Sequence, residues 1–127
     1  MTRESWRRKY DGDCYGWALN HVRPGDAIVH GTVVFPLTRE RGGHAWIERK
    51  GRVYDNNLAN FMKDSLPVPD YYRAMQAEAD DRYTDYEVQV YTLRTGRPGP
   101  WTENERGSKP EAPKRRRTRV RSPLTKE

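Results

Sequence analysis

The sequence predicts an α+β fold, in which a short helix near the N-terminus packs on a small antiparallel sheet. Two observations carry this prediction. Apolar residues between Cys14 and Val22 recur at the spacing of one helical face. Downstream, short runs rich in β-branched residues alternate with tight-turn residues, a pattern typical of strands joined into hairpins.

The helix is expected to begin after Asp13, whose side chain suits an N-cap, and to stop before Pro24-Gly25. Its apolar face has the spacing i, i+3, i+4 and i+7 and consists of Tyr15, Ala18, Leu19 and Val22. Gly16 weakens a helix of this length, so tertiary packing must hold the helix in place.

Three strands are expected next, over residues 26–35, 44–48 and 53–56. The first is rich in β-branched residues and ends at Pro36, and Lys50-Gly51 turns the second strand into the third.

Residues 69–78 predict a second short helix or an ordered loop. The alternation of Tyr86, Val88 and Val90 then predicts a final strand over residues 84–93.

Charge divides the 127 residues into two parts. Residues 1–95 carry 14 Lys/Arg and 14 Asp/Glu, whereas residues 96–127 carry 10 and 4, so the formal net charge of +6 belongs to the last part. Aliphatic residues nearly vanish there, and such a composition cannot bury enough surface to offset the entropy of ordering. We therefore expect a compact domain at 1–95 and a disordered basic tail at 96–127. Trp101 would either dock on the domain or serve as a short recognition element.

The single cysteine, Cys14, excludes an intramolecular disulfide and fits a reducing compartment. The N-terminal segment lacks the apolar run of a signal peptide, and no run reaches the roughly 18 apolar residues of a membrane span. We therefore expect a cytoplasmic protein with no membrane partner. Three scattered histidines and one cysteine lack the spacing of metal ligands, and no metal or other cofactor is expected.

Cys14, His44 and Asp55 form the candidate catalytic set. A cysteine is nucleophilic as the thiolate, and both a helix N-terminus and a nearby imidazole lower the pKa of a thiol. The position of Cys14 provides the first, and His44 provides the second if its strand crosses the start of the helix. A third polar group would hold the imidazole in one tautomer. The competing interpretation makes Cys14 a small buried apolar residue.

The identity of the third group depends on the register of the hairpin. With Lys50-Gly51 as a two-residue loop, His44 faces Asn57 and Asp55 lies diagonally on the same face, within side-chain reach. With a bulge at Gly51, the register slips by one and Asn56 faces His44 instead. We prefer Asp55, because a carboxylate stabilises an imidazolium better than an amide does; Asn56 and Asn57 are the alternates.

These residues resemble the papain-like cysteine hydrolases. Asp13-Cys14-Tyr15-Gly16-Trp17 is similar to the start of the nucleophile helix in NlpC-type cell-wall peptidases. Pro24-Gly25-Asp26 is similar to their Pro-Gly-Asp element, and Gly43-His44 to their Gly-His strand. His44-Ala45-Trp46 followed by Tyr54-Asp55 is also similar to transglutaminase-like proteins. The resemblance implies a papain-like fold in a small bacterial or phage protein, with a Cys-His-Asp triad.

Two functions of different classes are expected. The first is a thiol hydrolase or acyltransferase acting on an amide or ester bond of a peptide or protein, with Tyr10, His30 and Trp46 as candidate cleft residues. The competing interpretation makes His30 and Trp46 packing residues of their strands. The alternative is a catalytically silent papain-like binding module that its tail tethers to nucleic acid or another polyanion. The basic residues of that tail are Lys114, Arg115, Arg116, Arg117, Arg119 and Arg121.

Overall fold

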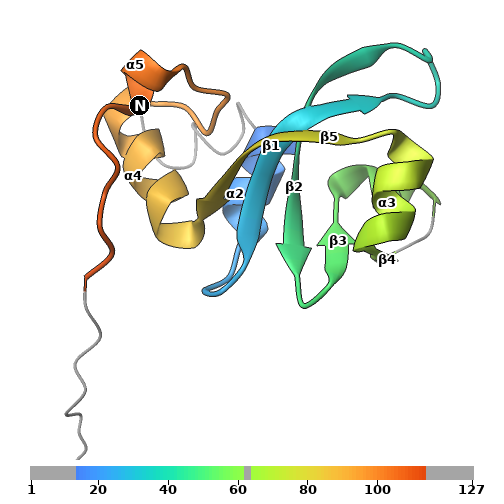
Figure 1. The fold of residues 1–127 in the computed structure, drawn as a ribbon, viewed down its shortest axis with the longest axis horizontal. Coiled ribbons are helices and arrows are strands. Elements are labelled where there is room, and N and C mark those ends of the chain that lie inside the picture. Colours follow the sequence, from blue (N-terminus) through green and yellow to red (C-terminus); the bar gives the residue numbers. More distant parts are fainter. Residues whose placement is uncertain (1–13, 62–63, 114–127) are drawn as a thin grey trace, which may run out of the picture.

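A five-stranded antiparallel sheet forms the centre of the molecule (Figure 1). The computed structural model describes residues 14–61 and 64–113 of the chain. The strands lie in the order β4-β3-β2-β1-β5, and every neighbouring pair is antiparallel. This arrangement of helices on an antiparallel sheet confirms the predicted α+β class.

The elements follow one another along the chain as α2 (Cys14–His21), β1 (Ala27–Val34), β2 (Arg41–Arg49), β3 (Arg52–Tyr54), the 3₁₀ helix η1 (Asn56–Phe61), β4 (Leu66–Pro67), α3 (Val68–Met75), β5 (Glu78–Thr84), α4 (Asp85–Thr95) and α5 (Glu103–Arg106). The first helix and the first three strands thus lie where the sequence predicts them. The helix expected within residues 69–78 is α3.

Apolar residues cover both faces of the sheet because neighbouring positions of a strand point to opposite sides. Ile28 of β1 and Ala45 of β2 belong to one buried cluster, which also contains Ala18 of α2 and Val88 of α4. The adjacent residues of the same strands belong to a second cluster, together with residues of η1 and α3; this cluster contains Val29, Trp46, Leu58, Tyr71 and Met75. In Figure 1, α4 and α3 lie at opposite ends of the molecule.

The expected strand over residues 84–93 is wrong, because the chain forms helix α4 there. Thr84 accepts a hydrogen bond from the backbone N–H of Glu87, and the Glu87 carboxylate accepts one from the N–H of Thr84. This reciprocal capping box begins the helix, and Gly96 ends it with a φ of 80°. The last strand, β5, comes just before and occupies the edge beside β1. Its charged residues suit an exposed edge.

The expectation of a disordered chain beyond Thr95 needs a correction for residues 96–113. This segment contains α5 and returns Trp101 to the core, where its side chain is 6 % exposed. The indole N–H donates to Thr95 Oγ1 and to the carbonyl of Arg97, both at 3.0 Å. The buried indole, together with polar contacts such as that of Arg106 with the Tyr83 hydroxyl, therefore holds a segment of low aliphatic content on the domain. Residues 114–127, the rest of the expected tail, lie outside the described residues.

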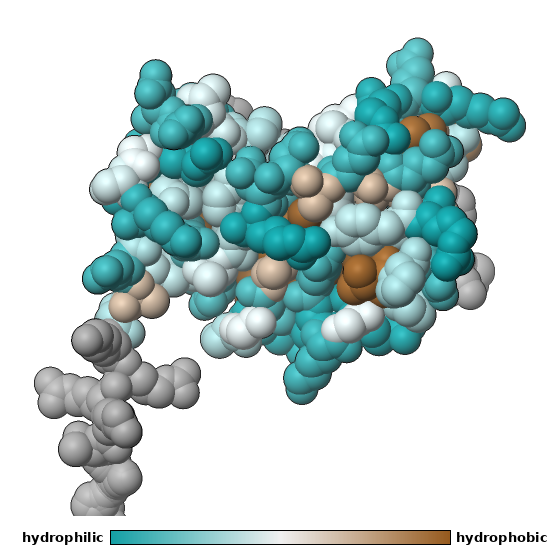
Figure 2. Space-filling view, in the orientation of Figure 1, coloured by the Kyte–Doolittle hydropathy of each residue, from teal (hydrophilic) through white to brown (hydrophobic). Residues whose placement is uncertain are grey.

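The surface in the orientation of Figure 1 is largely hydrophilic, and its outline is notched between the part built by α4 and α5 and the hairpin of β1 and β2 (Figure 2). Among the described residues, the large apolar side chains that are exposed are Leu37, at the turn between β1 and β2, and Leu93 on α4.

Candidate functional site

The hairpin of β2 and β3 has the two-residue loop and not the bulge. Arg49 pairs with Arg52, and Ile47 pairs with Tyr54. Lys50 and Gly51 both have positive φ angles, 52° and 79°, as the tight hairpin turn that follows the strand twist requires. This register brings Asp55, just past the end of β3, to the side of the hairpin on which His44 lies.

His44 and Asp55 form a buried pair. Their side chains are 3 % and 0 % exposed, and Nε2 of His44 lies 2.9 Å from both carboxylate oxygens of Asp55. The carboxylate therefore fixes the orientation of the imidazole and stabilises a proton on Nε2.

Two further groups hold the Asp55 carboxylate in place. The backbone N–H of Asn57 donates to Oδ1 at 3.0 Å, and the Tyr71 hydroxyl donates to Oδ2 at 2.5 Å. Burial, and then the charge of Asp55, raise the pKa of Tyr71 well above its usual value, so this hydroxyl stays a donor. The four-residue spacing of Tyr71 and Met75 in α3 signals a buried helical face in the sequence. That spacing does not predict that the Tyr71 hydroxyl bonds to Asp55.

The second ring nitrogen of His44 is the one open to Cys14. Nδ1 is buried and makes no hydrogen bond to an oxygen or nitrogen atom of the described residues. Burial lowers the pKa of His44, but the interactions with Asp55 and then with Cys14 outweigh it and raise that pKa from 6.5 to about 9. The thiol thus acts on the imidazole, and since Asp55 occupies Nε2, it acts from the Nδ1 side.

Cys14 lies at the first residue of α2 and is half-buried. The helix packs against β2, which carries His44, and against η1, which follows Asp55. Buried Gly16 and Ala18 allow the helix to approach the sheet closely. The tertiary structure therefore brings together Cys14, His44 and Asp55, the three residues proposed from the sequence.

The structure also places the candidate cleft residues Trp46 and His30 and the alternates for the third triad member, Asn56 and Asn57. Trp46 is fully buried and donates its indole N–H to Glu48, as a core residue does. His30 is also buried, on the opposite side of the sheet from Trp46 and within a group of aromatic rings. Asn56 begins η1 and is half-buried, and Asn57 reaches Asp55 through its backbone alone.

The remaining candidates lie outside the described residues: Tyr10 and the six basic residues Lys114, Arg115, Arg116, Arg117, Arg119 and Arg121. Within residues 14–61 and 64–113, no group of three or more His, Cys, Asp or Glu side chains could hold a metal ion. None of the helices described is both long and apolar enough to cross a membrane.

Comparison with known proteins gives no relative: no family model, no curated protein and no solved structure matches this chain. The function therefore has to be argued from the geometry of the site alone.

The His44–Asp55 pair makes a prediction about titration. In the variant Asp55→Asn, the His44 pKa should fall clearly below 9, because the amide removes the negative charge that stabilises the imidazolium. Since folding raises the His44 pKa above 6.5, the pair stabilises the fold fully below about pH 6.5, and this contribution is lost as the pH rises through about 9. NMR titration of the histidine ring signals measures the shift.

His21 provides the internal control for that titration, because it lies on the surface and its Nδ1 bonds to the carbonyl of Trp17. The substitution at Asp55 should leave the ring signals of His21 unchanged. An unchanged His44 curve in Asp55→Asn would contradict the coupling.

Proposed function

We propose that this protein is a thiol hydrolase or acyltransferase that uses Cys14 as nucleophile, His44 as acid and base, and Asp55 as the group that orients His44. The observation that carries the proposal is the buried His44–Asp55 pair, which occupies Nε2 of the imidazole and leaves Nδ1 for Cys14, whose thiol contributes to the raised pKa of His44. Nucleophile, base and orienting carboxylate in this order are the usual parts of an activated thiol.

The chemistry follows from the positions of the protons. His44 takes the thiol proton on Nδ1, and the resulting imidazolium is stabilised by Asp55 through Nε2. Cys14 Sγ forms a bond to the substrate carbonyl carbon, and the bond to the leaving amine or alcohol breaks as His44 returns the proton to it. Water or an amine then attacks the thioester, loses a proton to His44, and releases the acyl group from Cys14.

The start of α2 also suits the negative charge that develops on the carbonyl oxygen. The first N–H groups of an α-helix have no acceptor within the helix, and Cys14 is the first residue of this one. This oxyanion site would use backbone atoms.

The α+β architecture supports the finer assignment to a papain-like enzyme, in which a cysteine-bearing helix packs against an antiparallel sheet that carries histidine and then a polar residue. A peptide or protein amide is the substrate class that we propose on this basis, in a bacterial or phage protein acting in the cytoplasm.

Trapping of the acyl-enzyme tests the proposal. The full chain is mixed with a 4-nitrophenyl ester, quenched in acid and analysed by intact mass and by peptide mapping. We expect one acyl group per chain on Cys14, and none in the variant Cys14→Ser under the same conditions. Acylation spread over lysines, or equal labelling of wild type and Cys14→Ser, would contradict the proposal.

A further inference from the structure

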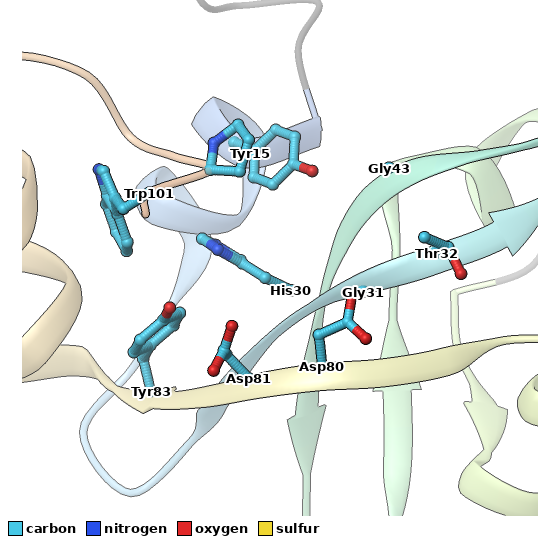
Figure 3. A pocket seen from close by; sticks show the side chains of 10 residues that line it. Tyr15, His30, Gly31, Thr32, Gly43, Asp80, Asp81, Tyr83 and Trp101 are labelled. Carbon is cyan, nitrogen blue, oxygen red and sulfur yellow. The ribbon is translucent and has the colours of Figure 1, made fainter. Parts of the chain in front are cut away.

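A hollow with a volume of about 290 Å³ lies between β1, β5 and the segment that carries Trp101 (Figure 3). Aromatic rings of Tyr15, Tyr83 and Trp101 line one part of it, and the carboxylates of Asp80 and Asp81 line another. This combination of rings and acids is not used by the chemistry described above.

The hollow adjoins the candidate catalytic site through the chain itself. Tyr15 follows Cys14, Gly43 precedes His44, and both residues line the hollow. The two come close together, since a Cβ atom on Gly43 would lie 2.9 Å from the Tyr15 hydroxyl oxygen. Neither Cys14 nor His44 lines the hollow, and the His44 ring lies on the other face of the sheet, so the hollow neighbours the triad along the chain and is not part of it.

An irregularity in β5 brings both acids to the hollow. Asp81 pairs with His30 and Ala79 pairs with Gly31, so Asp80 is an extra residue in the pairing of β5 with β1. In a regular strand, Asp80 and Asp81 would point to opposite faces of the sheet. The bulge changes the direction in which one of the two side chains points. Figure 3 shows the two carboxylates side by side.

Gly31 makes this bulge possible. A Cβ atom at that position would lie 2.0 Å from the carbonyl oxygen of Glu78 and 3.0 Å from the Cα of Ala79. The strand pairing thus requires glycine opposite the bulge, and the local geometry depends on it.

The carboxylates are only partly balanced by the protein. The Arg106 guanidinium lies 3.9 Å from Asp81, and it also bonds to the Tyr83 hydroxyl and the Trp101 carbonyl. Asp80 has no ion-pair partner among the described residues, and the nearby Arg41 pairs with Glu78 instead.

His30, which lines the hollow, adds no positive charge. Burial, and then the charge of Arg106, lower its pKa to about 3, so its ring is neutral at neutral pH. The hollow therefore combines π faces with an excess of negative charge.

We propose that this hollow binds a basic side chain of the substrate, that of lysine or arginine. Cations bind to the faces of aromatic rings and pair with carboxylates, and both kinds of group meet here. The volume is at the lower limit for a small-molecule site and suits one long side chain. The inference rests on the proposed function only in treating the ligand as part of the substrate.

Binding of a matched pair of small probes tests this inference. Acetyl-arginine methylamide carries the guanidinium, and acetyl-citrulline methylamide has nearly the same shape without the charge. Each is titrated into ¹⁵N-labelled full-length Cys14→Ser protein, which lacks the thiol nucleophile, and shifts of the Trp101 indole N–H signal are followed. We expect the arginine probe to bind at least about tenfold more tightly than the citrulline probe.

Substitutions of Asp80 and Asp81 test whether the preference for the arginine probe arises in the hollow. Asp80→Asn and Asp81→Asn should each weaken binding of the arginine probe several-fold, whereas Asp70→Asn should leave it unchanged. Asp70 is the matched control, because it is an exposed acid on α3 that pairs with Arg73. Melting curves of the variants show whether the fold is retained.

The outcomes separate this inference from the proposed function. Equal affinity for the two probes, no shift of the Trp101 signal, or arginine binding that survives both acid variants would overturn the basic side-chain pocket. If the arginine probe binds selectively but Cys14 is never acylated, the basic side-chain pocket is supported and the proposed thiol chemistry is refuted. If Cys14 is acylated but the two probes bind equally, the thiol chemistry is supported and the basic side-chain pocket is refuted.

Discussion

The variant Trp101→Ala is expected to lose about 3–5 kcal/mol of the free energy of unfolding, the usual cost of removing a large buried aromatic side chain. The Trp101 ring packs against the rings of His30, Tyr83 and Tyr91, at centroid distances of 5.1, 5.3 and 5.4 Å. Its removal leaves a cavity at the point where the segment after α4 joins the core. Chemical denaturation measures the loss, and a chain that ends at Thr95 should lose at least as much.

Two controls make that measurement specific. Leu93→Ala removes a side chain that is 84 % exposed, and it should change stability by no more than about 0.5 kcal/mol. A chain that ends at Pro113 retains every described contact of Trp101. If the chain ending at Thr95 melts together with the chain ending at Pro113, the docking of Trp101 does not stabilise the domain.

The variant His44→Ala is expected to slow acylation of Cys14 by about 10²–10⁴-fold, the usual contribution of a positioned acid and base. The imidazole is held by Asp55 and meets the thiol on its other side, so alanine leaves the nucleophile without a proton acceptor. Release of 4-nitrophenol in the first turnover measures the rate.

The pH dependence gives a second measure of the same group. With an amide substrate, the rate should fall as the pH rises through about 9, because His44 then loses the proton that the leaving amine needs. In Asp55→Asn, whose His44 pKa is lower, that fall should occur at lower pH. His21→Ala is the matched histidine control and should keep the wild-type rate. A rate that is indifferent to His44→Ala would mean that Cys14 reacts as an isolated thiol.

The hairpin of β2 and β3 was predictable from the sequence because its geometry is local. Lys50-Gly51 marks the turn, but the pair suits both a two-residue loop and a bulge, so the register stayed open until the structure showed the two-residue loop. Once the register is known, the alternation of strand residues places Asp55 on the side of His44. The start of α4 was equally local: Thr84 and Glu87 have the spacing of a capping box, a signal that the short alternation downstream concealed.

The sequence by itself thus determined the α+β class, the cysteine helix and a hairpin that turns at Lys50-Gly51, because periodicity, caps and turns act between residues close along the chain. Only the tertiary structure decided that Tyr71 meets Asp55 and that Trp101 closes the core. It also decided that the bulge at Asp80 turns two acids toward one hollow. These contacts join segments far apart in sequence, and they depend on how whole elements pack, which no local pattern encodes.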